Sequence, residues 1–312
     1  MNFVFLMDPL ETVIMEKDTS FILMLGAHRR RHKIYFVTDG DLVLKNSQLY
    51  FNALSVVPQL NKKNPFVLGK RSLLSDRDVD AVFVRSDPPF DSAYLMNTWL
   101  LDRLPKRVPV INSPAGLRTV NEKLWATQFT DFVPSTFIGR NREHQLSFIT
   151  EQKHIIAKPT DGFGGQAVFQ IKLGDSNTNV ILETLTRGFT HDIILQKFIP
   201  EAAKGDKRIL LLNGEILGAI MRVHPKNDFR NNLFAGGKAE TATVNRRDEE
   251  IIAALKPKLR ELGLYFVGID ILGGYLIEVN VTSPTCLQEM NGFYRQRLEE
   301  RVISFVEGLV KK

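Results

Sequence analysis

The chain has 312 residues, enough for two or three domains, and its 44% hydrophobic and 24% charged residues are typical of a globular protein. The net charge of +6 is compatible with scattered surface lysines or with an anionic small substrate. A nucleic-acid binder is disfavoured, because there is no concentrated basic stripe with interleaved aromatic residues. We see no signal-peptide pattern and no apolar stretch that could cross a bilayer, so we expect a cytoplasmic protein.

The first third of the chain alternates strand-like and helix-like segments. Strands are predicted over Phe3–Leu6, Ile34–Val37, Asp80–Arg85 and Val108–Ile111, and helices over Thr19–Arg30 and Ala93–Arg103. This β-α-β order predicts a parallel sheet covered by helices, with binding groups at the carboxyl ends of its strands. Asp8-Pro9 and Asp87-Pro88-Pro89 follow two of these strands. A dinucleotide site is disfavoured, because no Gly-x-Gly-x-x-Gly follows the first strand.

The pattern changes in the second part of the chain. A helix is predicted from Pro114 to about Phe129, and Pro134 marks a break. Antiparallel hairpins with interposed helices follow, and Asn213-Gly214 is a strong hairpin signal. Further helices are predicted over Asp248–Leu262 and Leu287–Leu309. We place boundaries near residues 122 and 200, which divides the chain into segments 1–122, 123–200 and 201–312.

The single cysteine, Cys286, cannot form an intramolecular disulfide, which fits a reducing compartment. A nucleophilic cysteine is disfavoured because no histidine pattern lies beside it. We expect Cys286 to be a small buried apolar residue.

A predicted hairpin between Val267 and Val281 carries the strongest signal for chemistry. A two-residue Gly273-Gly274 turn would put Asp270 and Glu278 on opposite faces, whereas a three-residue loop, Gly273-Gly274-Tyr275, would pair them. We expect the three-residue loop, with Asp270, Glu278 and Asn280 on one face and Ile269, Ile271, Ile277 and Val279 on the other. Carboxylates this close need a cation, and hard oxygen ligands suit Mg²⁺. The alternative is a half-exposed hairpin whose polar residues face solvent.

A second signal is the strand Ile155–Lys158, which runs into Gly162-Phe163-Gly164-Gly165. Glycines let backbone amides approach phosphate oxygens, and Lys158 adds a positive charge nearby. The Gly-Lys-Ser/Thr ending of a Walker A loop is missing, and a plain tight turn is the alternative.

A third signal is a set of basic residues that lie far apart in the sequence: Lys123, Arg208, Arg222 and Arg230. Arginine suits bidentate contact with carboxylate or phosphate. Arg208 and Arg222 lie on strands that should be half buried, where a charged side chain is unusual unless it has a partner or a function.

Taken together, these segments resemble the bacterial glutathione synthetases, which are ATP-grasp enzymes. The matching segments, in order and without large gaps, are Met7–Pro9, Lys17–Phe21, Arg85–Asp91, Asn121–Leu124, Lys158–Pro159, Gly162–Gly165, Gly205–Arg208, Arg230–Leu233, Ala235–Gly237 and Glu278–Thr285. The segments Asp87–Asp91 and Asn280–Thr285 are specific to this family, whereas the acidic-x-Asn metal motif is shared by ATP-grasp enzymes generally.

The resemblance implies a mixed α/β and α+β fold: an N-terminal parallel-sheet (Rossmann-like, pre-ATP-grasp) domain, then a two-lobed ATP-grasp fold. The implied activity is the ATP-dependent joining of γ-glutamylcysteine to glycine through an acyl phosphate, which gives glutathione, ADP and phosphate. It also implies two Mg²⁺ ions, with Mn²⁺ as a substitute, and a homotetramer or homodimer.

The resemblance also implies residue roles. The nucleotide would be held by Lys123, Lys158, Gly162, Gly164, Gly165, Gln196, Phe198, Ile199 and Asp206, and the metal ions by Asp270, Glu278 and Asn280. Arg208, Arg222 and Arg230 would face the acyl phosphate. The substrates would lie near Asp18, Ser20, Arg85, Asp87, Asn232, Ser283 and Thr285, with Ser283 helping to seat glycine.

The segment Arg222–Ala242 departs from the family pattern and is expected to be a mobile lid. Asn231, Phe234 and Lys238-Ala239 replace the usual Gly, Ala and Arg-Gly. Two alternative functions remain. A D-alanine–D-alanine or glutamate-adding ATP-grasp ligase would lack the Asp87–Asp91 segment, and a non-catalytic ATP-binding module would have lost metal ligands or arginines.

Overall fold

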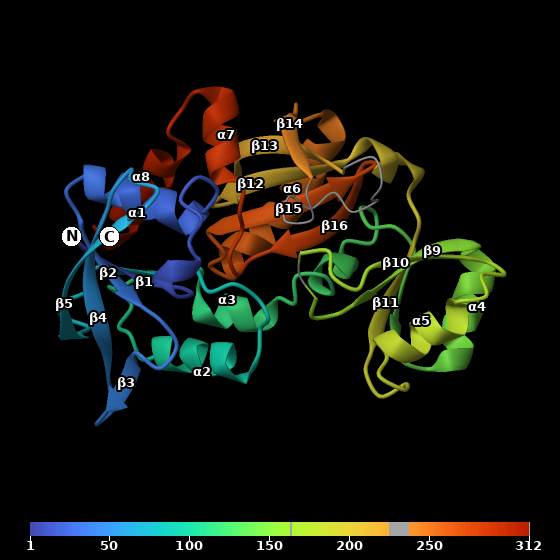
Figure 1. The fold of residues 1–312 in the computed structure, drawn as a ribbon, viewed down its shortest axis with the longest axis horizontal. Helices are drawn as coiled ribbons and strands as arrows, with labels where there is room; N and C mark the ends of the chain where they lie inside the picture. The colour runs from blue at the N-terminus through green and yellow to red at the C-terminus, as the bar shows by residue number, and fades with distance from the viewer. Residues whose placement is uncertain (163, 225–236, 312) are drawn as a thin grey trace.

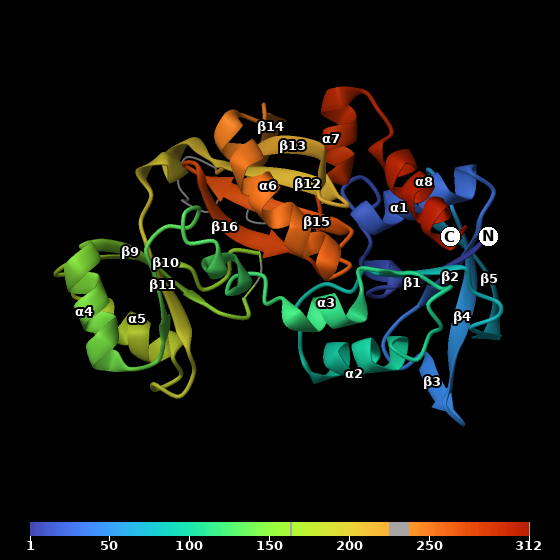
Figure 2. The same cartoon turned by 180° about the vertical axis from the view of Figure 1, so that it is seen from behind.

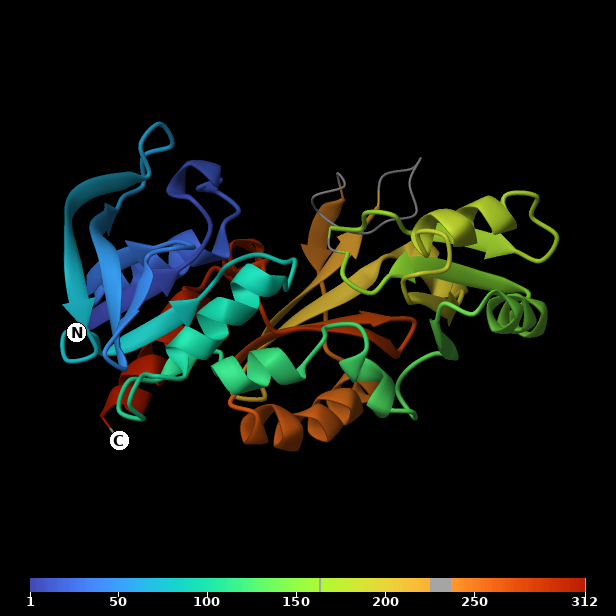
Figure 3. The ribbon, with the colours of Figure 1, turned by 90° about the horizontal axis from the view of Figure 1, so that it is seen from below.

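The computed structural model describes residues 1–162, 164–224 and 237–311. Within these residues the strands form three sheets of seven, four and five strands. The five-stranded sheet lies between the other two along the long axis, and both chain termini lie beside the seven-stranded sheet (Figures 1 and 3).

The seven-stranded sheet has the order β3-β4-β2-β1-β6-β7, with β5 paired to β4. Its strands are β1 (Asn2–Leu6), β2 (Lys33–Val37), β3 (Leu42–Lys45), β4 (Gln48–Pro58), β5 (Phe66–Ser75), β6 (Ala81–Val84) and β7 (Val110–Ile111). The pairs β1–β2, β1–β6 and β6–β7 are parallel, which confirms the predicted parallel sheet. The antiparallel strands β3 to β5 extend this sheet beyond β2 and are absent from the sequence-based prediction.

The helices of the first third begin at residues that cap them. Asp18 accepts a hydrogen bond from the Phe21 amide at 2.7 Å and starts α1 (Thr19–Arg29), while Asp91 caps α2 (Ser92–Leu101) through the Tyr94 amide at 2.9 Å. A 3₁₀ turn, η1 (Leu10–Thr12), precedes α1.

The predicted single helix from Pro114 to Phe129 is wrong. The chain forms α3 (Pro114–Thr119) and a 3₁₀ turn, η2 (Trp125–Gln128). Val120 is extended between them, because the next residues bond to a distant strand: the Glu122 carbonyl accepts from the Val279 amide at 2.8 Å. Tertiary hydrogen bonding thus ends a helix that local sequence would continue.

The four-stranded antiparallel sheet has the order β10-β9-β11-β8. Its strands are β8 (Thr136–Gly139), β9 (His154–Pro159), β10 (Phe169–Lys172) and β11 (Ile193–Lys197), and its helices are α4 (Arg142–Gln152) and α5 (Thr178–Leu185). The helices share one small hydrophobic cluster with the sheet, including Phe148, Leu182 and Leu195. A 3₁₀ turn, η3 (Pro200–Lys204), leads out of this unit.

The five-stranded antiparallel sheet has the order β14-β13-β12-β15-β16. Its strands are β12 (Asp206–Leu212), β13 (Glu215–Val223), β14 (Lys238–Thr241), β15 (Phe266–Leu272) and β16 (Tyr275–Asn280). The predicted Asn213-Gly214 turn joins β12 and β13, which pair in antiparallel register. Helix α6 (Arg246–Glu261) lies across this sheet (Figure 2).

The predicted closing helix over Leu287–Leu309 is also wrong. Two helices, α7 (Leu287–Tyr294) and α8 (Leu298–Val310), are separated at Arg295, whose φ is 51°. Asn291 holds this corner, because its Oδ1 accepts from the Leu298 amide at 2.9 Å and its Nδ2 donates to Glu299 Oε2 at 2.6 Å.

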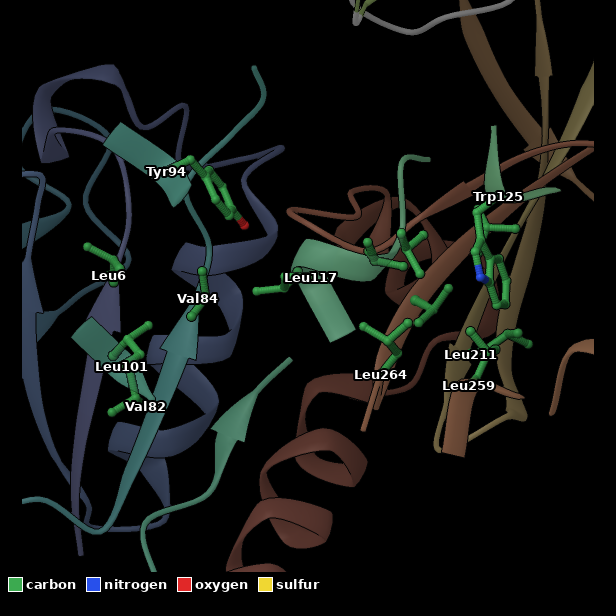
Figure 4. Packing of buried hydrophobic residues seen from close by; sticks show 14 of the residues in the cluster. Leu6, Val82, Val84, Tyr94, Leu101, Leu117, Trp125, Leu211, Leu259 and Leu264 are labelled. Atoms are coloured by element: carbon green, nitrogen blue, oxygen red, sulfur yellow. The ribbon is translucent and has the colours of Figure 1, made fainter. Parts of the chain in front are cut away.

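The seven- and five-stranded sheets share their cores. Val4 and Leu6 of β1 belong to a cluster with Leu117 of α3, Leu259 of α6 and β12, while Phe3 and Phe5 on the opposite face belong to a cluster with α1, α7 and α8. In Figure 4, Leu117 lies between the side chains of the N-terminal unit and those around Trp125 and Leu264. The Asn112 side chain adds hydrogen bonds of 2.7–2.8 Å to the Phe266 backbone and the Val281 carbonyl.

Candidate active site

A cavity of about 650 Å³ opens between the four- and five-stranded sheets and reaches the residues after β6. Its lining includes Gly162, Gly164 and Gly165, which follow β9, and residues 196–199, which span the end of β11. Polar residues of β12, β13, β15 and β16 line the other side. Asp87 and the segment Thr282–Thr285 complete it. Groups from all three sheets therefore face one space.

The β15–β16 hairpin pairs Asp270 with Glu278, as predicted, but not through the predicted loop. The turn is the two-residue Gly273-Gly274, both with positive φ, and it pairs Leu272 with Tyr275. A register shift after Asp270 inserts one extra residue, Ile277, which restores the pairing of Asp270 with Glu278. The predicted three-residue loop is wrong. The predicted placement of Ile277 on the face away from Asp270 and Glu278 is also wrong, because Ile277 lines the cavity with them.

An ion cluster lies at the base of the cavity. Arg208 on β12 donates from Nε to Asp270 Oδ1 at 2.5 Å and from Nη2 to Oδ2 at 2.9 Å. Arg222 on β13 lies with Nη2 3.0 Å from Asp270 Oδ2 and also forms a bidentate pair with Asp206, with Nε–Oδ1 at 2.9 Å. Antiparallel pairing places these residues together, because Arg208 lies opposite Asp270 and Asp206 lies opposite Arg222.

The electrostatics of this cluster are set by burial and pairing. Arg208, Arg222 and Asp270 are 5%, 5% and 4% exposed. Burial alone would raise the pKa of Asp270, but the charges of Arg208 and Arg222 outweigh it and hold that pKa well below its usual range. Asp270 is therefore a carboxylate at neutral pH, and the pKa values of both guanidinium groups are raised by the carboxylates beside them.

Two lysines line the cavity near the glycine-rich loop. Lys158 at the end of β9 is buried, with Nζ 3.3 Å from Gln196 Oε1, and burial lowers its pKa, although Glu278 opposes the shift. Lys123 Nζ contacts the Gly162 carbonyl and lies 3.9 Å from Glu278 Oε1. Lys123 therefore connects the glycine loop to the acidic hairpin.

The N-terminal sheet contributes a second group of residues. Asp8 and Asp87 follow the parallel strands β1 and β6 and meet there, as predicted, with the Asp87 amide 2.9 Å from Asp8 Oδ2. Burial raises the pKa of Asp87, while a hydrogen bond with Ser283 and the charge of Arg85 oppose the shift.

Arg85 is buried beneath the segment that carries Ser283. Its Nε donates to Ser20 Oγ and its Nη2 to the Pro284 carbonyl, both at 3.0 Å, while Nη1 has no hydrogen-bond partner among the described residues. Its pKa is lowered by burial, and Asp18 and Asp87 oppose this effect. Asp18, Ser20 and Arg85 thus lie behind the cavity wall rather than in it.

The structure brings most of the predicted site residues to one cavity. The lining residues among them are Asp87, Lys123, Lys158, Gly162, Gly164, Gly165, Gln196, Phe198, Ile199, Asp206, Arg208, Arg222, Asp270, Glu278, Asn280, Ser283 and Thr285. Arg230, Asn232 and most of the predicted lid lie outside the described residues. Cys286 is buried, as predicted.

Sequence reasoning missed the role of Glu122 and the apolar lining formed by Leu272 and Ile277. Glu122 Oε1 accepts from the Val281 amide, the Thr282 amide and Thr282 Oγ1 at 2.8, 3.0 and 2.8 Å. The sequence offered one signal for Glu122: it lies beside Lys123 in Asn121–Leu124, one of the segments that resemble the family.

A divalent cation fits the acidic hairpin. The cavity lining holds five carboxylates (Asp87, Glu122, Asp206, Asp270, Glu278) and five cations (Lys123, Lys158, Lys197, Arg208, Arg222), so an added polyphosphate needs further positive charge. No group of three or more His, Cys, Asp or Glu suited to a metal occurs in the described part of the chain. Asn280 would supply the third oxygen once its amide group turned over, since its Nδ2 donates to Asp270 Oδ2 at 3.4 Å. Mg²⁺ commonly takes few protein ligands and completes its shell with phosphate.

Solved structures share this fold. The chain matches D-cycloserine synthetase with a TM-score of 0.68 at 14% identity, over 98% of this chain and 99% of the other. It matches the ATP-grasp ligase PsnB, complexed with a minimal precursor, with a TM-score of 0.65 at 16% identity, over 98% of each chain. These likenesses show that the chain has the ATP-grasp fold, and enzymes with this fold generally use ATP with a divalent metal.

The sequence matches two family models: the N-terminal domain of prokaryotic glutathione synthetase over residues 1–118 and its ATP-grasp domain over residues 122–295. Glutathione synthetase of Synechococcus elongatus is 38% identical over 100% of both chains, and that of Vibrio cholerae is 36% identical over 98% of this chain and 96% of the other. The chain belongs to the prokaryotic glutathione synthetase family, and it is an ATP-dependent ligase. Among the described helices, none combines the length and apolar character that a bilayer span requires.

Proposed function

We propose that this ligase joins γ-glutamylcysteine to glycine, with conversion of ATP to ADP and phosphate. The observation that carries the proposal is that one cavity is lined by the nucleotide-side residues Lys123 and Lys158 and by Asp87 and Ser283. Asp87 follows a strand of the N-terminal sheet, so a substrate held there would meet the γ-phosphate of a nucleotide held by the other two sheets.

The nucleotide would lie between the four- and five-stranded sheets. Ile199, Leu272 and Ile277 supply apolar surface for the base, with Gln196 and Phe198 beside them. Lys123, Lys158 and the amides near Gly162, Gly164 and Gly165 would hold the phosphates, since glycines allow close backbone approach. Asp206 lies on the same cavity and is tied to Arg222.

Asp270, Glu278 and Asn280 would hold two Mg²⁺ ions, and Mn²⁺ could replace them because it also accepts oxygen ligands. Bound there, the ions would supply positive charge that offsets the negative charge of the phosphates. Both Asp270 oxygens accept from arginines. A metal ion bound through Asp270 would therefore share a carboxylate that already accepts from both arginines.

The reaction needs an activated carboxylate, because oxide is a poor leaving group. Transfer of the γ-phosphoryl group of ATP to the dipeptide carboxylate gives an acyl phosphate, and Arg208 and Arg222 would stabilise its negative charge and the later oxyanion. The roles expected for Arg230, which would face the acyl phosphate, and for Asn232, which would lie near the substrates, stay predictions. Most of the acceleration would come from positioning and electrostatics.

The dipeptide would lie near Asp87, Ser283 and Thr285, with Ser283 helping to seat glycine. Asp18, Ser20 and Arg85 would support this end from behind, since Arg85 bonds to both Ser20 and the Pro284 carbonyl.

The test is phosphate release with γ-glutamylcysteine, with and without glycine, and mass spectrometry of the product. We expect ATP turnover that depends on both acids and yields glutathione. Joining of D-alanine to D-alanine, addition of glutamate, or ATP binding without turnover would each contradict the proposal.

We also propose a cytoplasmic homo-oligomer. The edge strand β5 leaves Val67, Leu68 and Leu73 47%, 59% and 61% exposed, and a second copy would cover them. Light scattering should show an oligomer that Leu68→Lys weakens, whereas a monomeric wild type would contradict this.

The three-segment division at residues 122 and 200 is likewise a proposal. It is supported by the sheets, each of which is built from residues of one segment. Limited proteolysis should cut first near residue 122 or 200, and primary cuts within a sheet would contradict the division.

A further inference from the structure

Glu122 is fixed on both sides by the end of β16. Its carbonyl accepts from the Val279 amide, and its Oε1 accepts from the Val281 amide, the Thr282 amide and Thr282 Oγ1. Three donors on one oxygen hold the carboxyl group in a single orientation. The segment that it holds lies between Asn280 and Ser283, so Glu122 is rigidly placed relative to both.

The second oxygen, Oε2, accepts no hydrogen bond from any of the described residues. Glu122 is partly exposed, and it lines the cavity. The other lining carboxylates are engaged: Asp206 and Asp270 by arginines, Asp87 by Ser283, and Glu278 beside Lys123. Among the lining carboxylates, Glu122 therefore has an oxygen, Oε2, that takes no part in the proposed binding of ATP, metal or dipeptide.

The ligation step has an unmet requirement. An amino acid arrives with its amine as an ammonium group, whose nitrogen has no lone pair to attack an acyl carbon. A fixed carboxylate at the cavity wall can bind that ammonium and remove a proton from it. We propose that Glu122 binds the ammonium group of the incoming amino acid through Oε2 and takes its proton, as the general base of the amide-forming step. This inference rests on the proposed function.

The step balances. Glu122 carboxylate takes one proton from the ammonium, which leaves a neutral amine and a carboxylic acid. The nitrogen lone pair forms the bond to the acyl carbon, and the carbonyl π pair moves to oxygen. When the carbonyl reforms, the bond to phosphate breaks, its electron pair leaves with phosphate, and that phosphate takes the second nitrogen proton. Glu122 then releases its proton to solvent.

The surroundings favour this role. Burial raises the pKa of the Glu122 carboxyl, although the hydrogen bonds from Thr282 and Val281 oppose the shift, and nearby Glu278 raises it further. A carboxylate with a raised pKa is a stronger proton acceptor than an ordinary glutamate.

Glu122→Gln tests the inference, because the amide oxygen can still accept from Val281 and Thr282 while the amide nitrogen replaces Oε2. We expect kcat/KM for glycine to fall roughly 100-fold or more, the scale of general-base catalysis. The rate of acyl phosphate formation with γ-glutamylcysteine alone should equal that of the wild type. Positional isotope exchange in ATP measures this rate. A normal kcat/KM for glycine in this variant would overturn the proposal.

Hydroxylamine separates a catalytic role from a structural one, because it is uncharged at neutral pH and needs no base. Glu122→Gln should form the hydroxamate at close to the wild-type rate. Equal loss with glycine and with hydroxylamine would overturn the proposal and make Glu122 a structural residue. Thr282→Val is the matched control: it removes one bond to Oε1, spares Oε2, and should keep the wild-type ratio of the two nucleophiles. Failure of the wild type to use γ-glutamylcysteine would instead contradict the proposed function.

Discussion

Arg208 and Asp270 form a buried bidentate ion pair across the neighbouring strands β12 and β15, with Nε–Oδ1 at 2.5 Å and Nη2–Oδ2 at 2.9 Å. Arg222 approaches the same carboxylate at 3.0 Å. One predicted metal ligand is thus held by two residues that we expect to stabilise the phosphoryl group. Any metal ion bound through Asp270 would share this carboxylate with both arginines.

Arg208→Ala should lower kcat by roughly 100-fold or more, because it removes a preorganised charge donor. It should also reduce the free energy of unfolding by about 3 kcal/mol, since Asp270 loses its bidentate partner and keeps Arg222 as its one remaining cation. Steady-state kinetics and urea unfolding measure the two effects. Arg208→Lys, which keeps the charge but not the bidentate geometry, should be intermediate. Near-normal turnover in Arg208→Ala would remove Arg208 from the mechanism.

Glu278→Gln should weaken Mg²⁺-dependent nucleotide binding by more than the roughly 10- to 100-fold that loss of an outer-shell partner costs. The reason is that a neutral amide replaces a charged oxygen on the face shared with Asp270. Calorimetric titration of Mg²⁺ in the presence of ADP measures this. The exposed Glu249→Gln is the control and should titrate like the wild type. If both variants give the wild-type curve, Glu278 is not a metal ligand.

Glu307 should contribute stability that depends on pH. Hydrogen bonds from Arg30 lower the pKa of Glu307 from 4.5 to about 2; burial opposes this, and His32 adds to it. Because the folded-state pKa is depressed, this stability is present above about pH 4.5 and is lost as pH falls toward 2. Thermal unfolding should show Glu307→Gln less stable than the wild type at pH 6, with a gap that narrows below pH 4.5. Glu261→Gln is the control, because Glu261 pairs with Lys258 at an exposed site, and its stability should stay close to that of the wild type at every pH. A stability difference for Glu307→Gln that did not change with pH would contradict the predicted contribution of Glu307.

Gly205→Ala should damage both stability and activity. Gly205 has a φ of 104°, and an added Cβ would overlap the Arg222 carbonyl oxygen. Gly174→Ala is the control, since Gly174 has a φ of 87° but open space around it. We expect Gly174→Ala to cost roughly 1–2 kcal/mol of stability from backbone strain, with normal kinetics. Gly205→Ala should cost more and also lower kcat, because Arg222 must shift. Equal effects of the two changes would show that the contact with Arg222 is unimportant.

The sequence predicted local order well where the pattern and the tertiary structure agree. The parallel core strands, the Asn213-Gly214 turn and the helix that begins at Thr19 are all present. Helix prediction failed at Val120, because the neighbouring Glu122 bonds to the distant strand β16. It also failed at Arg295, where the Asn291 side chain holds a local corner between two helices. Strands β3 to β5 were missed because their alternation becomes informative only once β2 offers an edge to pair with.

The acidic hairpin shows the division between sequence and tertiary structure. The sequence by itself determined which oxygen-bearing side chains the hairpin carries, and its resemblance to one family determined the class of chemistry. Only the tertiary structure decided how Asp270 comes to lie opposite Glu278, because a bulge at Ile277 and not a longer turn corrects the register. It also decided that Asp270 is held by Arg208 and Arg222 and that Glu122 leaves one oxygen free, because burial and long-range pairing depend on strands that are distant in the chain.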